Sequence, residues 1–381
     1  MVGIERGRDG LRWLDRTIGI PAVAALSVLK RRRQIPSDIS SIGLIALGAI
    51  GDTIISVGSA VPVLRRAFPQ AKLYLFTSKS NAGIAPLLPP VDELQVISVT
   101  NPMQAVSLLR SIKQDILIDF GPWPRISALL AALSGASFTV GFKTPGQYRH
   151  YTFDLAVKHS GKIHEFENHA NLLASIGMPR PAWPRITPSA AARGSVREQR
   201  SKPYVVFHPW ASGFKSEMRE WPDGHWQELA VIIAQRGWDV VFTGGPADVA
   251  KSRTLVEGIA RHEGKVHDAA GRFSLDETAA LLEGSASVVT VNTGIMHLAA
   301  AMNAPIVALH GPTDPVRWGP LCDNARVILP DSSDVAYLNL GFEYPKHAVS
   351  RMQLIGVDKI AASVFDQLKL VRESRAGGAF S

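Results

Sequence analysis

One acidic residue follows two closely spaced glycines near the start of the chain, in the sequence GAIGD from Gly48 to Asp52. The loop follows an apolar run over 42–47, and Gly48 and Gly51 let the backbone turn tightly and approach a ligand. Asp52 is the only carboxylate of the loop, which makes it a candidate general base for a hydroxyl group. The alternative is a helix N-cap, a position that Asp favours. The spacing fits neither the dinucleotide-binding fingerprint nor a Walker loop.

Two cations, Lys215 and Arg219, lie in the loop HPWASGFKSEMREWP. This loop follows an apolar run over 204–207, so the cations come shortly after the end of a predicted strand. Arg can hold phosphate oxygens bidentately and Lys acts as a point charge, so the pair suits a phosphate ligand. The alternative is a solvated loop whose cations pair with the neighbouring glutamates.

Paired glycines end the next predicted strand, in the sequence TGGP at 243–246. Gly244 and Gly245 would let a ring or a ribose lie against the backbone beside Thr243. An ordinary turn is the alternative, and the pattern favours neither interpretation.

The most informative stretch runs over 285–320. The apolar run 288–291 predicts a buried strand, the polar turn NTG follows, and 296–302 has the Ala-rich composition of a helix. The first amides of such a helix favour an anion. The polar candidates are Asn292, Thr293, Gly294 and His297, which is preceded by Met296. A lone His on an apolar helix is, however, more often a core residue than a catalyst.

Strands that alternate with helices must position these residues. The pattern predicts an α/β fold, with two doubly wound parallel sheets facing each other across a cleft. In such sheets ligands bind beyond the carboxyl ends of the strands, where all the candidates would lie. Strands are predicted at 42–47, 72–76, 95–99, 115–119 and 139–142, and then at 204–207, 239–243, 288–291 and 305–309.

The domain boundaries follow from composition. We expect a basic amphipathic N-terminal segment over 1–40, a first domain over 41–180, a linker over 181–203, a second domain over 204–354 and a closing helix over 355–371. The linker is expected because its Pro-, Ser- and Arg-rich sequence lacks the alternating pattern. Pro62 is expected to kink or interrupt the helix that follows Asp52.

Composition narrows the classes of partner. The 381 residues carry a formal net charge of +8, which suggests an anionic partner, but no nucleic-acid-binding signature is present. The single cysteine, Cys322, excludes an intrachain disulfide, and no cluster has metal-ligand spacing, so no metal is expected. No apolar run reaches the roughly 18 residues of a membrane span and no signal peptide is recognisable, so we expect a cytoplasmic protein.

The segment 1–40 holds apolar residues between clusters of Arg and Lys. This composition is typical of a segment that lies on an anionic membrane surface, here the inner face of the cytoplasmic membrane. The alternatives are a helix packed on the protein's own surface and a disordered tail.

Four blocks of the sequence resemble glycosyltransferase family 9, the heptosyltransferases of lipopolysaccharide core synthesis. They occur in the family's order, and the resemblance covers about residues 41–370. The blocks are LGAIGDTIISVGSAVPVLRRAFPQAKLYLFT at 47–77, HPWASGFKSEMREWP at 208–222, FTGGPAD at 242–248 and VNTGIMHLAAAMNAPIVALHGPTDPVRWGP at 291–320.

The resemblance implies two Rossmann-like domains in the GT-B arrangement and an inverting sugar transfer without a metal ion or another cofactor. Asp52 falls on the family's proposed general base, with Gly48 and Gly51 near the acceptor. The donor, most simply ADP-heptose, would be held mainly by the second domain. With the residues singled out above, the expected donor-binding set is Lys215, Arg219, Thr243, Gly244, Gly245, Asp248, Phe273, Asn292, Thr293, Gly294, Met296 and His297.

The implied acceptor is a lipopolysaccharide core or a related lipid-linked glycan. Two departures concern the donor: many members have Asp where this chain has Asn292, and many have Gly in place of Trp210. Two alternatives remain open at this point: a non-catalytic relative that binds a sugar nucleotide or glycan, and a sugar-nucleotide epimerase of the same layout.

Overall fold

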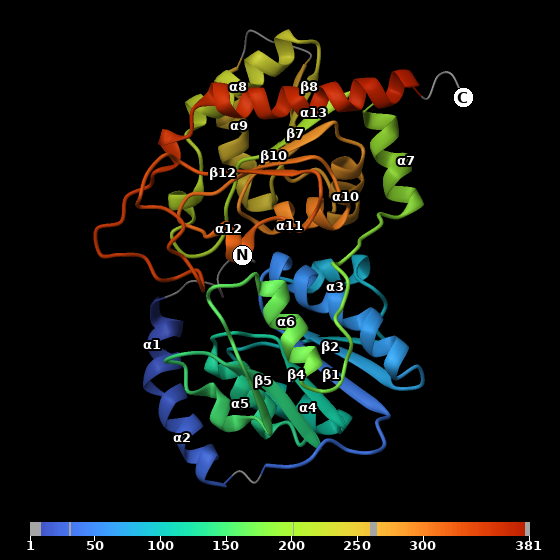
Figure 1. Cartoon of the computed structure of the whole chain (residues 1–381), viewed down its shortest axis with the longest axis vertical. Helices are drawn as coiled ribbons and strands as arrows, with labels where there is room; N and C mark the ends of the chain where they lie inside the picture. The colour runs from blue at the N-terminus through green and yellow to red at the C-terminus, as the bar shows by residue number, and fades with distance from the viewer. Residues whose placement is uncertain (1–8, 30–31, 201, 260–264, 378–381) are drawn as a thin grey trace. The chain divides into compact units, whose positions relative to one another are not determined.

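The structure is a computed structural model that describes residues 9–29, 32–200, 202–259 and 265–377 (Figure 1). The chain divides into two compact units, 1–185 and 186–381. Each unit is built around one six-stranded sheet. None of the described helices combines the length and the apolar composition that spanning a bilayer requires.

The sheet of the first domain has the order β3-β2-β1-β4-β5-β6, and all its strand pairs are parallel. This is the doubly wound order, in which the chain reverses direction across the sheet between β1 and β4. Its central strands are buried on both faces, which explains their nearly continuous apolar runs. The strands are β1 (Ser41–Ala46), β2 (Lys72–Thr77), β3 (Glu93–Val96), β4 (Ile116–Asp119), β5 (Phe138–Lys143) and β6 (Leu155–Lys158).

Helices cover both faces of this sheet (Figure 1). Helix α3 (Ile50–Ala67) follows β1 and passes through Pro62 as one element, so a break there is wrong, and a kink stays a prediction. Nearly all of α3 up to Leu64 is buried, and this packing outweighs the roughly 3 kcal/mol that an internal proline costs a helix. The other elements are α1 (Asp9–Thr17), α2 (Gly19–Leu29), η1 (Ala82–Leu87), α4 (Pro102–Ile112), α5 (Arg125–Leu133), η2 (Arg149–Thr152) and α6 (Glu165–Ala174).

The second domain repeats the same topology. Its order, β12-β11-β10-β7-β8-β9, places the reversal between β7 and β10. The strands are β7 (Tyr204–His208), β8 (Asp239–Phe242), β9 (Val266–Asp268), β10 (Ser287–Val291), β11 (Ile306–Leu309) and β12 (Ala325–Ile328). The helices are α7 (Ala190–Gln199), η3 (Ser216–Arg219), α8 (Asp223–Gln235), η4 (Pro246–Asp248), α9 (Val249–Glu257), α10 (Leu275–Glu283), α11 (Gly294–Ala301), α12 (Pro315–Trp318), η5 (Met352–Leu354) and α13 (Val357–Gly377).

The segment 181–203 is more than the expected linker, because it contains α7. The hydroxyl group of Ser189 caps this helix by accepting a hydrogen bond from the Ala192 amide at 3.1 Å. Ala192 and Val196 are buried, and α7 packs against α10. Only these two apolar side chains are buried on α7, so the composition resembled a linker although the segment forms a helix.

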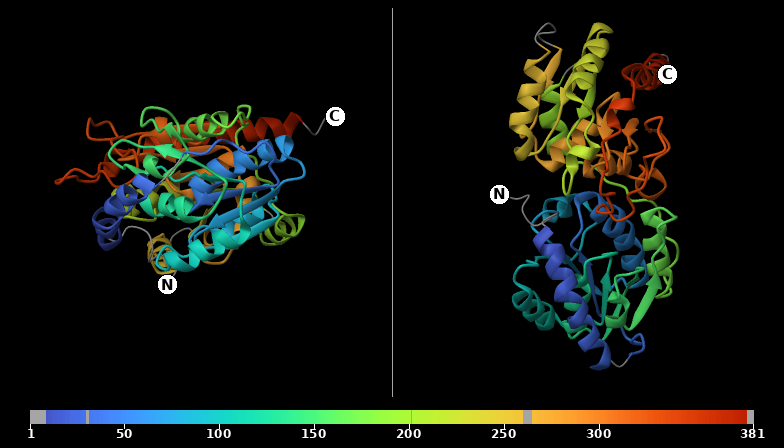
Figure 2. Two further views of the ribbon diagram at one scale, coloured as in Figure 1. Left: turned by 90° about the horizontal axis from the view of Figure 1, so that it is seen from below. Right: turned by 90° about the vertical axis from the view of Figure 1, so that its left-hand side faces the viewer.

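The described part of the N-terminal segment packs on the first domain, as one of the two alternatives to membrane contact anticipated. In both Figure 1 and Figure 2, α1 and α2 lie along this domain, and α2 contacts α5 and η2. The Asp15 carboxylate is 2.6 Å from Nη1 of Arg125, and it also accepts a hydrogen bond from the Arg125 amide at 2.8 Å. Both side chains are largely buried, so the described helices belong to the folded domain.

Candidate functional site

The carboxyl end of β1 presents Asp52 on the first turn of α3. Ala49 is the N-cap of this helix and Asp52 is its third residue. The alternative prediction that Asp52 itself is the N-cap is therefore wrong. The carboxylate nevertheless stabilises the helix start, because its Oδ2 accepts a hydrogen bond from the Ala49 amide at 2.7 Å. Gly48 must be glycine, since a Cβ atom there would lie 2.8 Å from both Cβ and Oδ2 of Asp52. Because glycine lacks a Cβ atom, the backbone at Gly48 can lie close to the Asp52 carboxylate.

A buried ion pair stands at the end of the neighbouring strand. Asp119 is the last residue of β4, and its Oδ2 accepts a hydrogen bond from Nη2 of Arg149. Its other oxygen accepts from the Gly121 amide at 2.8 Å. The sequence analysis did not single out this pair. An Asp that ends an otherwise apolar strand was the available signal.

In the second domain, the carboxyl ends of β7 and β8 bring two polar side chains together. Nδ1 of His208 lies 3.0 Å from Oγ1 of Thr243, which donates its proton to the Phe207 carbonyl at 3.2 Å. Thr243 therefore accepts from the Nδ1–H of a neutral imidazole. Burial lowers the pKa of His208 to about 4, so the ring is neutral at physiological pH. The sequence analysis assigned no role to His208.

The indole ring of Trp210 packs against the glycine turn that follows β8. A Cβ atom on Gly244 would lie 2.8 Å from Cδ1 of Trp210 and 2.9 Å from Cβ of Asp248. Trp210 is only 5% exposed, and Nζ of Lys251 lies over its ring at 5.6 Å. Asp248 accepts a hydrogen bond from the Gly245 amide at 2.8 Å, and burial raises the pKa of its carboxyl group. The turn, the indole ring and Asp248 therefore form one packed unit.

Asn292 follows β10, and its side chain forms a hydrogen bond to a backbone carbonyl group far along the sequence. Its side-chain amide donates to the Trp318 carbonyl at 3.0 Å, and its Nδ2 lies 3.9 Å from the sulfur of Met296. Thr293 is the N-cap of α11, but in the described structure its hydroxyl group caps none of the first amides. The start of this eight-residue helix is thus available for an anion. His297 and Met296 are both buried on α11, and Gly294 opens the helix.

Aromatic residues surround the first of the two predicted cations. Nζ of Lys215 lies 5.3 Å from the ring centroid of Tyr344 and 5.8 Å from that of Phe214. Lys215 has a left-handed backbone with φ of 49°, and its carbonyl accepts a hydrogen bond from the Tyr344 hydroxyl at 3.3 Å. The positive charge of Arg219 acts on the same hydroxyl group and opposes the rise that burial causes in the pKa of Tyr344.

One loop connects the predicted cations with Asn292. Asn339 accepts a hydrogen bond from the Trp318 indole through its carbonyl at 2.8 Å and one from Arg317 through its side chain at 2.7 Å. Tyr344 lies five residues further along and contacts Lys215. Lys215, Arg219 and Asn292 therefore belong to one assembly, which the loop over 336–344 holds at the carboxyl edge of the sheet. Because Lys215 and Tyr344 are 129 positions apart in the chain, no local sequence signal revealed their contact.

Glu220, in the loop over 208–222 that also holds Lys215, forms its ion pair with another cation. Glu220 lies 3.6 Å from Lys251, and it accepts a hydrogen bond from the Ala211 amide at 3.2 Å. Phe273 is partly buried and precedes Ser274, the N-cap of α10. No described contact joins Phe273 to the assembly around Asn292, so its predicted role stays a prediction.

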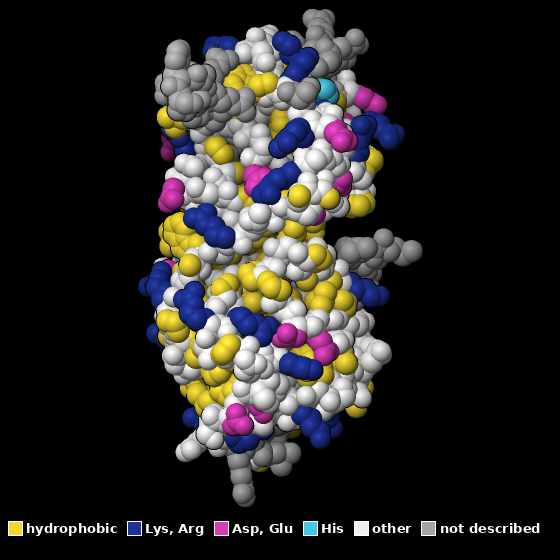
Figure 3. Space-filling model, turned by 90° about the vertical axis from the view of Figure 1, so that its right-hand side faces the viewer, with side chains coloured by type: hydrophobic (Ala, Val, Ile, Leu, Met, Phe, Trp, Pro, Cys, Tyr) yellow, Lys and Arg dark blue, Asp and Glu magenta, His cyan; other side chains and the backbone are white. Residues whose placement is uncertain are grey.

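Charged side chains of both signs are interspersed on one face of the described surface. Figure 3 shows Lys and Arg scattered over both domains, with Asp and Glu among them on the face it displays. Among the described residues, no group of three or more His, Cys, Asp or Glu side chains is placed to hold a metal ion.

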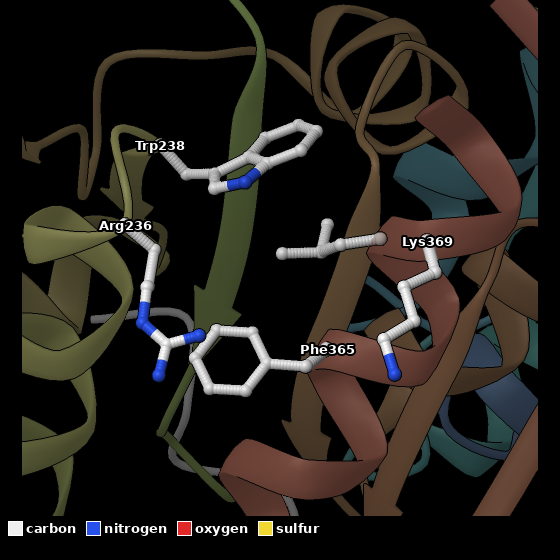
Figure 4. Close-up of a pocket in the computed structure, with 5 residues that line it drawn as sticks. Arg236, Trp238, Phe365 and Lys369 are labelled. Atoms are coloured by element: carbon white, nitrogen blue, oxygen red, sulfur yellow. The ribbon is translucent and has the colours of Figure 1, made fainter. Parts of the chain in front are cut away.

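A small pocket lies away from the candidate site. Figure 4 shows Arg236 and Trp238 facing Phe365 and Lys369 of α13, and the Arg236 guanidinium stacks 4.6 Å from the Phe365 centroid. Arg236 and Trp238 precede β8, whereas the candidate residues follow the strands. The pocket is therefore at the amino edge of the sheet and does not belong to the candidate site.

Comparison with known proteins identifies relatives by sequence. The model of glycosyltransferase family 9 (heptosyltransferase) matches residues 107–338. Lipopolysaccharide heptosyltransferase 2 of Escherichia coli (strain K12) is 31% identical over 157 residues, or 40% of this chain and 44% of that protein. Lipopolysaccharide heptosyltransferase 1 of Salmonella typhimurium is 35% identical over 116 residues, or 30% of this chain and 34% of that protein. These matches span less than half the length of either relative.

A solved structure extends the likeness to both domains. Escherichia coli ADP-heptose lps heptosyltransferase II superposes with a TM-score of 0.72 at 22% identity, covering 87% of this chain and 99% of that one. Escherichia coli heptosyltransferase WaaC with ADP-2-deoxy-2-fluoro heptose superposes with a TM-score of 0.63 at 19% identity, covering 86% and 99%. The predicted fold class, two Rossmann-like domains as in GT-B heptosyltransferases, is thereby confirmed.

Proposed function

Because the chain belongs to glycosyltransferase family 9 (heptosyltransferase), we propose that it transfers a sugar from a nucleotide-sugar donor to a glycan acceptor. In its specific form, the donor is ADP-heptose and the acceptor is a lipopolysaccharide core or a related lipid-linked glycan. The names of the curated relatives and the ligand of the solved WaaC structure support this choice.

The observation that carries the proposal is the assembly at the carboxyl edge of the second sheet. Lys215 and Arg219 supply positive charge near Tyr344, and the uncapped start of α11 supplies amides. A nucleoside diphosphate needs both kinds of group. We assign the diphosphate to the two cations, Thr293 and Gly294, and the sugar to Asn292, Met296 and His297. The base and ribose would contact Phe273, Asp248 and the turn formed by Thr243, Gly244 and Gly245.

The proposed mechanism is a single displacement with inversion. Asp52 takes the proton of an acceptor hydroxyl group, whose oxygen attacks the anomeric carbon of the donor sugar as the bond to the diphosphate breaks. The two cations and the α11 amides stabilise the negative charge that develops on the leaving diphosphate. In this proposal they take the place of a metal ion.

The lipid-linked acceptor defines where the enzyme would work. We propose that the protein is cytoplasmic and acts as a peripheral protein at the inner face of the cytoplasmic membrane. Its excess of basic residues, with a formal net charge of +8, is compatible with both an anionic donor and an anionic lipid surface.

The test is release of nucleoside diphosphate by the purified protein across a panel of nucleotide sugars that includes ADP-heptose. Each donor is incubated with and without deacylated lipopolysaccharide core, which removes the membrane from the assay. Acceptor-dependent release from ADP-heptose, with the anomeric configuration of the product inverted and full activity in EDTA, is the expected result. Donor binding without release, or conversion of the donor without any acceptor, would overturn the transferase assignment.

A further inference from the structure

We propose that the exposed face of α2 docks the first domain on an anionic lipid bilayer. The inference deepens the proposed function, on which it rests for a lipid-linked acceptor, by naming the surface that meets the membrane. This docking face is formed by Ile20, Pro21, Ala24, Ala25 and Val28, all of which are exposed.

Helix α2 is almost entirely apolar, with Ser27 as its one polar side chain, although only one of its faces is covered. Its sequence, GIPAVAALSVL, contains no charged residue. Gly19 and Val23 are buried on the side that packs against α5 and η2. The docking face occupies the opposite side at helical spacing, and Val28 is 85% exposed. A surface helix normally presents polar residues to water, so an apolar outer face indicates a second apolar environment.

Larger exposed apolar side chains lie on the elements next to α2. Trp13 of α1 is 63% exposed, and Ile18, between α1 and α2, is 61% exposed. Tyr148 and Tyr151, at η2 beside α2, are each about half exposed. Tyr and Trp favour the boundary between lipid headgroups and acyl chains, because their rings are apolar and their edges are polar.

Cations flank these apolar residues. Arg16 is exposed near the start of α2, Arg32 is exposed shortly after its end, and Lys143 is exposed at the end of β5. Arg32 and Lys143 both lie close enough to His150 of η2 for their charges to help lower its pKa. The nearest described acid on α1, Asp15, is paired with Arg125. An apolar face between cations matches a surface with anionic headgroups above acyl chains.

The shape of this surface favours a bilayer over a protein partner. The 11 residues of α2 are too few to span a bilayer, so the helix would lie in the interface. The docking face is the convex side of one helix, whereas a protein partner would need a complementary groove. A symmetric contact between two copies would also bring the flanking cations toward their counterparts.

The test is flotation of the full chain with vesicles of phosphatidylcholine containing phosphatidylglycerol, compared with phosphatidylcholine alone. We expect binding to the anionic vesicles that weakens as salt is raised. The double variant Ile20→Asp, Val28→Asp should lower the partition coefficient about tenfold or more. The double variant Arg32→Glu, Lys143→Glu should lower it about tenfold on anionic vesicles only.

Matched controls come from the same domain. Met103→Asp changes a side chain that is 75% exposed on α4, and Arg66→Glu with Lys72→Glu repeats the charge reversal on exposed residues elsewhere. Both controls should bind vesicles like the wild type. Undiminished binding by the α2 variant, equal loss in the controls, or a wild-type dimer that the α2 variant converts to monomer would overturn the proposal.

Failure of the docking surface and failure of the proposed function give different results. With deacylated, water-soluble acceptor, the α2 variant should retain wild-type transfer, because its substitutions lie on an exposed helix face outside the candidate site. Loss of vesicle binding with retained transfer supports the docking face. Vesicle binding in a protein without transferase activity would leave the docking face standing and refute the enzymatic proposal.

Discussion

The side-chain amide of Asn292 donates a hydrogen bond to the backbone carbonyl of Trp318, 26 positions along the chain. A carboxylate cannot donate this bond and would face the carbonyl oxygen instead. We therefore expect Asn292→Asp to lower the free energy of unfolding by about 1–3 kcal/mol and to weaken donor binding. Urea unfolding and donor titration measure the two effects. Asn101→Asp, at an exposed N-cap where Asp serves equally well, should change neither; equal effects at both positions would contradict the prediction.

The packing around Gly244 predicts a size-dependent effect. Gly244→Ala would place a Cβ atom 2.8 Å from Trp210 and 2.9 Å from Cβ of Asp248, so both side chains must move. We expect a loss of about 1–3 kcal/mol in the free energy of unfolding. Gly245→Ala is the matched control, because its Cβ atom meets only Oδ2 of Asp248, at 3.6 Å. Thermal and urea unfolding should separate the two variants, and equal stability would show that the indole ring gives way freely.

Asp52 can be tested without removing its structural hydrogen bond. Asn in its place can still accept from the Ala49 amide, so Asp52→Asn should cost at most about 1 kcal/mol of stability through the lost charge near the helix start. As the proposed base, however, its loss should lower kcat by about 100-fold to 10000-fold while donor affinity stays unchanged. Single-turnover transfer and donor titration measure these quantities, and wild-type kcat would refute the assignment.

Lys215 should act on the donor diphosphate through its charge. Lys215→Met keeps the alkyl chain against Tyr344 but removes the ammonium group, and we expect donor affinity to fall about tenfold. The difference from the wild type should shrink as ionic strength rises. Lys346→Met removes the same charge from an exposed position close to Tyr344 and should leave affinity unchanged. An equal loss of donor affinity in both variants would contradict the prediction, because it would indicate the summed electrostatic field of the protein rather than a direct contact of Lys215 with the diphosphate.

Two buried histidines predict how stability depends on pH. Burial lowers the pKa of His208 and of His169 to about 4, from an ordinary value of 6.5. Between these values the unfolded chain binds protons that the folded chain does not. The stability is therefore fully present above pH 6.5 and falls as pH drops toward 4, by up to about 1.4 kcal/mol per pH unit for each ring. Urea unfolding from pH 7 to 4.5 should show this slope, and His208→Gln should reduce it; an unchanged slope would contradict the prediction.

The sequence predicted the central strands better than the edges of the sheets. The inner strands are buried on both faces and form apolar runs, so β1, β4, β7 and β10 were located within one or two residues. The edge strands are more exposed: β3 begins two residues earlier than predicted, and β6, β9 and β12 were missed. A strand that pairs on one side only can carry polar residues, which removes the pattern on which the prediction depends.

The sequence predicted those residues of the candidate site that directly follow a buried strand. Asp52, Thr243 and Asn292 each come shortly after a buried strand, so their common placement at carboxyl edges followed from the topology. Their partners did not follow, because the contacts of Tyr344 and Trp318 depend on how a loop without regular structure returns to the sheet. The role of Trp210 likewise depends on a contact with Gly244 that no local pattern encodes.

The pairing of Asp15 with Arg125 has a consequence for shortened forms of the protein. A chain that began at Ser41 would retain every strand of the first sheet but would lose the carboxylate that neutralises a guanidinium only 4% exposed to solvent. Removing one partner of such a pair typically costs about 3–5 kcal/mol, a large share of a domain's total stability. The helix that carries Asp15 is therefore part of the folded domain, and trimming the chain to its recognisable family core should yield a poorly soluble product.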